Sequence, residues 1–228
     1  MSLCLEQEIT EEMVQRKAMT SDLTKVEALS LNAMRITSVT YGATVMRKMS
    51  KLQDLNLSNN KISKVSALSE LKHLQTLVLM GNRIEEIGQL NLPVLTVLNL
   101  NYNKITAISG LRGLKKLEEL SLEKNLIEEP SMQEIGFNLI SLKELNLRGN
   151  KITAVTKLTG YPNVEKVILD RNPLSEIEPT AFKGCTELKS LYLNRIQLPN
   201  YTGDLKFLRY SPNLLVSCHG FPVTPTFF

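Results

Sequence analysis

The sequence predicts an α/β solenoid of about eight repeats. We expect a concave parallel β-sheet, short helices and 3₁₀ turns on the convex side, and helical caps at both ends. Three observations predict it. The pattern LxxLxLxxNxI first appears over residues 52–62 and recurs along most of the chain. Its asparagines are separated by 22, 21, 22, 25 and 22 positions. The leucines before each asparagine alternate with other residues, as in a strand with one buried face.

Each position of the repeat has a physical reason. In the first clear copy, Leu55 and Leu57 mark a short strand, because their side chains point to the same face. Strands of successive repeats are expected to pair into one parallel sheet, and the rest of each repeat returns along the other side. Further copies begin at Leu74, Leu95, Leu117, Leu142 and Val164.

An asparagine follows each of these strands, where the chain turns inward. Its amide carries two N–H donors and a carbonyl acceptor, so it satisfies backbone groups that a buried turn would leave unpaired. Such side chains, stacked repeat over repeat, predict a structural ladder along the solenoid. Its members are Asn60, Asn82, Asn103, Asn125, Asn150 and Asn172.

The chain divides into repeats and two different ends. We assign residues 1–25 to an N-terminal capping helix, 26–198 to the repeats, and 199–228 to a C-terminal cap and extended tail. In the cap, residues 201–210 predict a helix that precedes a last strand at 214–216. The tail carries three phenylalanines, and it either folds back on the cap or reaches a partner.

The N-terminal helix has a clear start signal. Thr10 supplies a hydroxyl cap, and Glu11 and Glu12 place acids in the first turn, where the helix dipole favours them. We expect this helix to cover the open end of the solenoid; the alternative is a separate partner-binding helix. The first repeat has Met34 where asparagine is expected and is 26 residues long instead of 22, as suits a repeat next to a cap.

The return segments differ in length. The short ones fit 3₁₀ turns or brief helices. Residues 128–141 space their apolar side chains as in a helix, and residues 175–187 predict a second short helix after Pro179. Cys185 falls on the apolar side of that segment, so we expect a buried structural thiol.

Composition narrows the function classes. Net charge is +4, from 27 basic and 23 acidic residues that are interleaved along the chain. This pattern favours a solvated surface over a nucleic-acid patch, so nucleic acid is not expected as a partner. Cys4, Cys185 and Cys218 are scattered, which favours a reducing compartment. The start MSLCLEQEIT does not resemble a signal peptide and no segment predicts a membrane span, so we expect a cytoplasmic protein.

The sequence argues against an enzyme. Its only histidines, His73 and His219, stand near no nucleophile or carboxylate in a pattern typical of catalysis. It contains no glycine-rich phosphate loop and no paired CxxC or HxxxH. We therefore expect no catalytic residue, cofactor, metal or small-molecule substrate.

A protein partner is expected on the concave face, where the residues between the buried leucines point outward. Val78, Met80 and Val97 are apolar there, and with Tyr102 they form a candidate anchor beside a charged strip. The alternative is tolerated surface apolarity. The candidate partner-binding residues are Val78, Met80, Val97, Tyr102, Glu119, Glu123, Glu144, Arg148, Lys166, Asp170, Tyr192 and Arg195.

The repeats resemble those of leucine-rich repeat proteins over roughly residues 26–216. The period and segments such as LSELKHL and LRGLKKL resemble one subfamily. Its members include a regulatory subunit of protein phosphatase 1 and the axonemal dynein light chain with leucine-rich repeats. The start ITEEMVQRKAMTSDLTKVEALSL is similar to leucine-rich repeat proteins of cilia and basal bodies. The ending YTGDLKFLRYSPNLLV resembles the helical cap of many members, although Ser217 and Cys218 replace a leucine–aspartate pair.

The resemblance implies a non-catalytic scaffold for protein–protein interaction. Its expected setting is the ciliary or flagellar axoneme, as a structural or assembly component, with tubulin, dynein or other axonemal proteins as partners. One alternative is a regulatory subunit that grips a protein phosphatase or similar enzyme along the concave face. The other is a ribonucleoprotein scaffold, although the strip lacks aromatic stacking positions for RNA.

Overall fold

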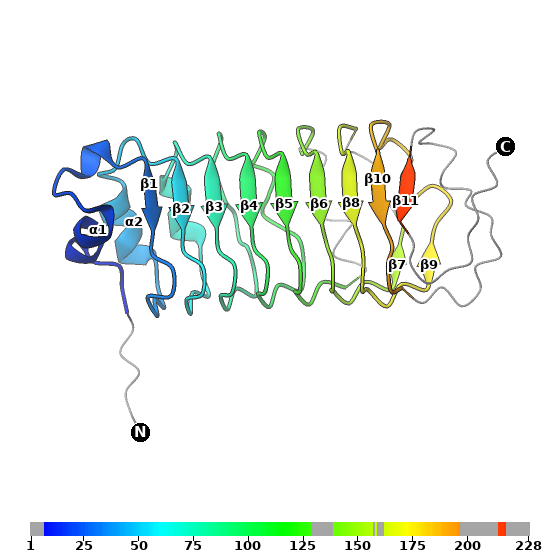
Figure 1. The fold of residues 1–228 in the computed structure, drawn as a ribbon, viewed down its shortest axis with the longest axis horizontal. Coiled ribbons are helices and arrows are strands. Elements are labelled where there is room, and N and C mark those ends of the chain that lie inside the picture. Colours follow the sequence, from blue (N-terminus) through cyan, green and yellow to red (C-terminus); the bar gives the residue numbers. More distant parts are fainter. Residues whose placement is uncertain (1–6, 129–138, 157, 159–161, 197–213, 218–228) are drawn as a thin grey trace, which may run out of the picture.

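The chain winds into a solenoid whose strands lie side by side in one sheet, as the computed structural model shows (Figure 1). The structure describes residues 7–128, 139–156, 158, 162–196 and 214–217. The predicted parallel-sheet solenoid is confirmed: nine strands follow one another in chain order, each parallel to its neighbours. They are β1 (Ala28–Ser30), β2 (Asp54–Asn56), β3 (Thr76–Val78), β4 (Val97–Asn99), β5 (Glu119–Ser121), β6 (Glu144–Asn146), β8 (Lys166–Ile168), β10 (Ser190–Tyr192) and β11 (Leu215–Ser217).

The strands pair so that equivalent positions of successive repeats lie opposite each other. Leu55 of β2 pairs with Leu77 of β3, which pairs with Leu98 of β4, and all three are buried. Their neighbours within each strand are half-buried or exposed. The alternation thus puts one leucine stack into the core and leaves one face of the sheet toward solvent.

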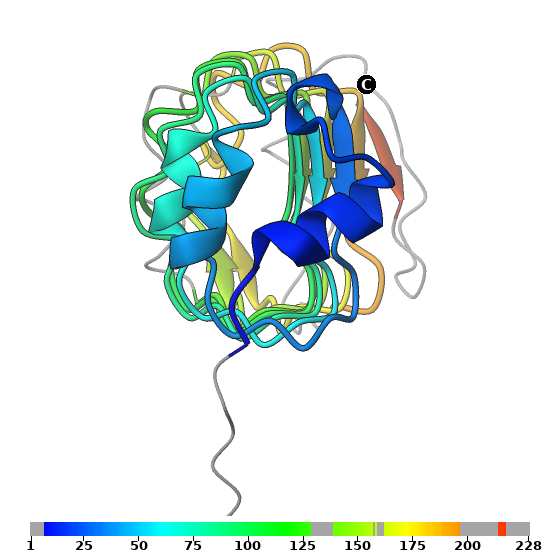
Figure 2. The same ribbon diagram turned by 90° about the vertical axis from the view of Figure 1, so that its left-hand side faces the viewer.

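The return side of the solenoid carries few helices. Helix α2 (Thr40–Met46) lies opposite the sheet in the first repeat, and the 3₁₀ helix η2 (Ser66–Glu70) follows in the second (Figure 2). Helix α2 accounts for the greater length of the first repeat, which the sequence analysis related only to its place next to a cap. Most other described return segments are turns, because so few residues remain between two strands.

The helix predicted over residues 175–187 is wrong. The segment begins with β9 (Glu176–Ile177), which pairs in parallel with β7 (Ala154–Val155) on the return side (Figure 1). Tight turns follow, in which the Cys185 N–H donates to the Phe182 carbonyl at 3.0 Å. Gly184 adopts a φ of +100°, a conformation outside any right-handed helix, so the stretch after Pro179 is too short to propagate one.

Cys185 lies in the core of this repeat, as the sequence predicted. Its Sγ donates to the Leu158 carbonyl at 3.1 Å. Burial raises the pKa of the thiol to about 12, so it stays protonated at physiological pH. A protonated, buried thiol has a structural role.

The N-terminal helix α1 (Glu11–Ala18) starts where the sequence predicts. The Thr10 side chain accepts a hydrogen bond from the Met13 N–H at 3.2 Å. A 3₁₀ helix, η1 (Leu23–Lys25), then leads into β1, and α1 packs against that strand at the end of the solenoid (Figure 2). Ile9 is buried beneath α2, where a Cβ at Gly42 would come within 2.5 Å of the Ile9 Cβ.

Three sequence predictions concern residues outside the described part of the chain. These are most of the helix at 128–141, the helix at 201–210 and the tail at 220–228. The last strand, predicted at 214–216, is present one residue later as β11.

Candidate functional site

The asparagine ladder lies beneath the ends of the strands and is fully engaged in the fold. Asn125 is typical: its Oδ1 accepts from the Ile105 N–H at 3.0 Å, and its Nδ2 donates to the carbonyls of Leu100 and Leu122, each at 3.0 Å. Each ladder residue therefore ties its own repeat to the one before. The same pattern holds at Asn60, Asn82, Asn103, Asn150 and Asn172.

The outward side chains of the sheet form three columns that run across the strands. We call these columns together the outer face. The first column runs Asp54, Thr76, Val97, Glu119, Glu144, Lys166 and Ser190, and the second runs Asn56, Val78, Asn99, Ser121, Asn146, Ile168 and Tyr192. The third stands two positions beyond the second and runs Ser58, Met80, Asn101, Glu123, Arg148, Asp170 and Asn194, of which Ser58 is buried.

The apolar residues singled out from the sequence lie on this face but in different columns. Val78 pairs with Asn99, and Val97 pairs with Thr76, so the two valines are diagonal neighbours. Both are half-buried, as is Met80 just beyond β3. The sequence analysis grouped these residues as one anchor, whereas the strand register places polar Asn99 and Thr76 directly opposite the two valines.

A second apolar pair lies near the other end of the outer face. Tyr192 of β10 is directly opposite Ile168 of β8. The Lys166 Nζ lies 5.8 Å from the centre of the Tyr192 ring and 3.1 Å from a Glu144 oxygen. Tyr192 and Lys166 are among the candidate residues predicted from the sequence. Alternation with Val167 places Ile168 outward as well, but it was not counted among the candidates.

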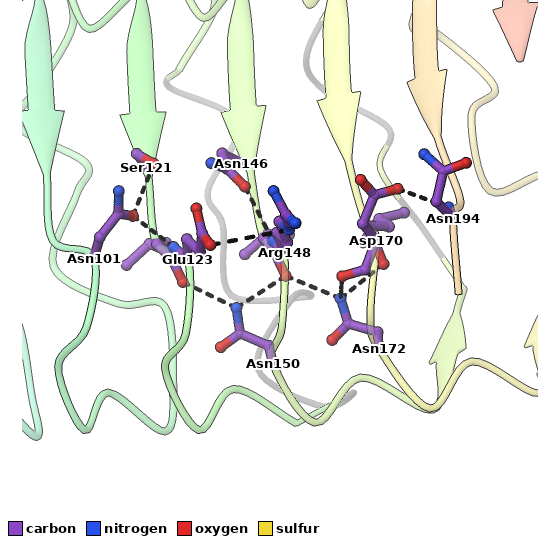
Figure 3. A network of polar contacts seen from close by, with 12 residues as sticks. Asn101, Ser121, Glu123, Asn146, Arg148, Asn150, Asp170, Asn172 and Asn194 are labelled. Atoms are coloured by element: carbon purple, nitrogen blue, oxygen red, sulfur yellow. Dashed lines mark hydrogen bonds and ion pairs between the residues drawn. The ribbon is translucent and has the colours of Figure 1, made fainter. Parts of the chain in front are cut away.

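Hydrogen bonds fix the third column (Figure 3). The Asn101 Oδ1 accepts from the Ser121 hydroxyl at 2.8 Å and from the Glu123 N–H at 2.6 Å. The Asp170 Oδ1 accepts from the Asn194 N–H at 2.7 Å. These bonds join neighbouring repeats, so a partner would meet a polar surface that is already ordered.

Charges on the outer face are only partly compensated. Glu119 and Glu144 lie opposite each other, and only Glu144 forms an ion pair within the described residues. Arg148 approaches Glu123 loosely, at 3.9 Å, and its buried Nε has no hydrogen-bond partner. The Arg148 side chain is still 36 % exposed, which leaves it open to an acceptor from a partner.

Tyr102 and Arg195 lie beyond the outer face, in the turns that follow β4 and β10. Tyr102 is 47 % exposed, and Lys124 of the next repeat places its Nζ 5.0 Å from the ring centre. Tyr102 has a φ of +55° and Arg195 of +57°, at a turn position where Gly81 supplies glycine in another repeat. A large side chain there is strained and has no role in the core, which favours an external role.

Replacing Tyr102 with glycine tests whether the ring serves the stability of the fold or the binding of a partner. Relief of the left-handed strain, worth about 1–2 kcal/mol, is partly offset by the entropy of an unfolded glycine, about 0.5–1 kcal/mol. We expect a free energy of unfolding that is unchanged or raised by up to about 1 kcal/mol, with weaker partner capture. Urea denaturation and a pull-down measure the two effects. Tyr102→Ala, which keeps the strain, is the matched control; a clear loss of stability in the glycine variant would make the ring structural.

A shallow depression lies at the opposite edge of the sheet, beside His73. Its volume is about 480 Å³, and its lining includes Lys51, Gln53, His73 and Lys116 but no carboxylate. A general acid–base pair is thus missing from this lining. In the described residues, no cluster of three or more histidine, cysteine or acidic side chains is arranged to hold a metal, and no helix has the length and apolarity to cross a membrane.

Comparisons with known proteins agree with the repeat architecture. Three family models match: leucine rich repeat over residues 24–84, leucine rich repeats in two copies over 93–131, and leucine rich repeat over 138–155. No curated protein sequence matches the chain.

Two solved structures are similar. Internalin C2 of Listeria monocytogenes has 22% identity and a TM-score of 0.70, and the match covers 91% of both chains. TLR13, solved as a complex with ssRNA13, has 24% identity and a TM-score of 0.80. That match covers 93% of this chain but 30% of the TLR13 chain. At these identities the likeness concerns the fold alone.

Proposed function

We propose, from the premise that the chain is a leucine-rich repeat protein, that it is a non-catalytic scaffold that binds a protein partner on the outer face. This fold is typically an interaction scaffold, and its function depends on the outward side chains. The observation that carries the proposal is the composition of that face. Val78 with Val97 and Ile168 with Tyr192 are half-buried apolar pairs, and charged side chains lie between them.

The dimensions and chemistry of the outer face support this proposal. The seven strands that make up the outer face, at about 4.8 Å spacing, give a strip close to 30 Å long, enough for an interface of ordinary size. Apolar anchors surrounded by polar groups are typical of protein interfaces, where aromatic and arginine side chains contribute most of the binding energy. Tyr192 and Arg148 are such residues, and the Arg148 side chain is 36 % exposed.

The setting we propose is the ciliary or flagellar axoneme, with tubulin, dynein or another axonemal protein as partner. Its support is the resemblance of the repeats and of the N-terminal segment to axonemal and basal-body proteins. A regulatory subunit of a phosphatase is the alternative, because the same resemblance includes such a subunit. A ribonucleoprotein scaffold is the third; TLR13 was solved with RNA, but on the described outer face only Tyr192 is aromatic.

Affinity purification with mass spectrometry distinguishes these settings. Recovery of tubulin or dynein subunits supports the axonemal role, and a phosphatase catalytic subunit supports the regulatory one. Ribonucleoproteins released by nuclease treatment support the third. The partner identified in this way then serves as the purified ligand in the mutational test.

The double variant Val78→Glu, Met80→Glu tests the outer face. Two carboxylates would have to be desolvated in the interface, so we expect affinity for the purified partner to fall at least about tenfold. Calorimetry or anisotropy measures this. Ser63→Glu, Ser66→Glu is the control and places the same charges at exposed positions on the return side of the preceding repeat. If the Val78→Glu, Met80→Glu variant keeps its affinity and both variants melt like the parent, this part of the outer face does not bind the partner.

A further inference from the structure

The edge where the strands end carries one basic side chain in every repeat. In each case the basic residue flanks the ladder asparagine or the residue that replaces it. Neither flanking position holds an acidic residue in any of the eight repeats. We call this row the basic edge; it consists of Arg35, Lys61, Arg83, Lys104, Lys124, Lys151, Arg171 and Arg195. The arrows of the strands point toward this edge in Figure 1.

The row is regular because the backbone beneath it is stacked. The N–H of Lys61 donates to the Ile36 carbonyl at 2.7 Å, and that of Lys104 donates to the Ile84 carbonyl at 2.9 Å. The N–H of Lys151 donates to the carbonyl of Ile127 at 2.9 Å. The main chain thus anchors these residues to the preceding repeat, whereas the N–H groups of Lys124 and Arg171 donate to the carbonyls of Arg148 and Asn194 in the following repeat.

The basic edge is uncompensated. All of its side chains are exposed except Lys61, which is half-buried, and none forms an ion pair with another described residue. In the third column of the outer face, the Asp170 Oδ1 accepts from the Asn194 N–H, and Glu123 faces Arg148 at 3.9 Å. Glu85, Glu86, Glu128 and Glu176 follow the edge on the return segments, and no ion pair joins them to it within the described residues.

The opposite edge of the same sheet differs, because two lysines there form ion pairs with carboxylates of the preceding repeat. Lys143 contacts Glu118, and Lys189 contacts Glu165, both at 2.7 Å. The hydrogen bond that Lys143 donates to Glu118 raises the pKa of Lys143, and the one that Lys189 donates to Glu165 lowers the pKa of Glu165. The solenoid therefore forms cross-repeat ion pairs at one edge and presents unpaired cations at the other.

We propose that the basic edge binds an extended acidic segment of a protein. Eight repeats at about 4.8 Å spacing give a row close to 35 Å long, which an extended chain of about ten residues spans at about 3.4 Å per residue. Glutamate and aspartate carboxylates match lysine and arginine along such a row. This surface is separate from the outer face, so it would bind even where the outer face is blocked.

A single-stranded nucleic acid fits the edge less well. Proteins that bind single strands combine positive charge with aromatic platforms on which the bases stack. Tyr102 is the only aromatic side chain that the described residues place along the basic edge, and Lys124 already lies over its ring. Charge without stacking favours a polypeptide partner.

The test uses a fluorescent deca-glutamate peptide and the full-length chain. The edge variant is Lys61→Glu, Lys104→Glu, Lys151→Glu, three equivalent positions that follow ladder asparagines and have no left-handed backbone. The control, Lys51→Glu, Lys115→Glu, Lys116→Glu, makes the same change in net charge at exposed positions of the opposite edge. Anisotropy titrations are run at low and high salt, with thermal melts to verify folding.

We expect the edge variant to bind the peptide at least about tenfold more weakly than the parent, and the control within about threefold of it. Binding of the parent should weaken steeply between about 0.05 and 0.5 M salt. The proposal is overturned if both variants lose the same affinity for the peptide, or if the edge variant loses none. Tighter binding of a uridine decamer, lost in the edge variant, overturns it in favour of nucleic acid. The Val78→Glu, Met80→Glu protein should still bind the peptide, which separates this edge from the outer face.

Discussion

Replacing Asn125 with alanine should lower the free energy of unfolding by about 3–5 kcal/mol. Its side chain makes a weak bond to the Glu123 carbonyl at 3.4 Å and three shorter bonds, to the N–H of Ile105 and the carbonyls of Leu100 and Leu122. The three shorter bonds are buried, and each polar group left without a partner costs about 1–3 kcal/mol. Asn125 also stands in the middle of the solenoid, so its loss weakens the coupling between the two halves.

Urea denaturation followed by circular dichroism measures this effect, because the chain has no tryptophan for fluorescence. Asn99→Ala is the matched control. Asn99 lies on the outer face, where its Oδ1 accepts only from the Asn101 N–H at 3.1 Å and water can replace it. We expect that control to lose less than about 1 kcal/mol. Similar losses in the two variants would contradict a special role for the ladder.

Replacing Phe182 with alanine should lower the free energy of unfolding by about 3–5 kcal/mol. We expect this destabilisation to be confined to one end of the solenoid. Phe182 is fully buried and is the largest of the fully buried side chains in the described residues. It is held in the turns between β9 and β10, near the C-terminal end of the solenoid. Since repeats contact only their neighbours, the cavity should loosen this end first. Hydrogen exchange is expected to speed up around β8 to β10 and to stay unchanged in β2 to β4.

Lys183→Ala is the control for this cavity, because Lys183 is the next residue and is exposed. We expect it to change stability by less than about 0.5 kcal/mol and to leave the exchange pattern intact. If Phe182→Ala instead raised exchange equally in all strands, the solenoid would unfold as one unit, and the independence of its end would be refuted.

Much of the fold was predictable because its signals are local. The period, the alternation around Leu55 and Leu57, and the recurring asparagine all appear within about 22 residues, and the structure has the predicted sheet and core. The helix cap at Thr10 was predictable for the same reason. The helix expected at 175–187 failed because Gly184 adopts a left-handed conformation and the chain there pairs β9 with β7, a partner one repeat away.

The sequence by itself therefore determined the solenoid, its core and its ladder. The tertiary structure decided which outward residues meet: Ile168 joins Tyr192, Val78 and Val97 become diagonal, and eight cations align along one edge. The physical reason is the spacing of the repeats. Residues 21 to 25 positions apart in sequence come within one strand spacing in space, about 4.8 Å, through pairing that no local pattern contains.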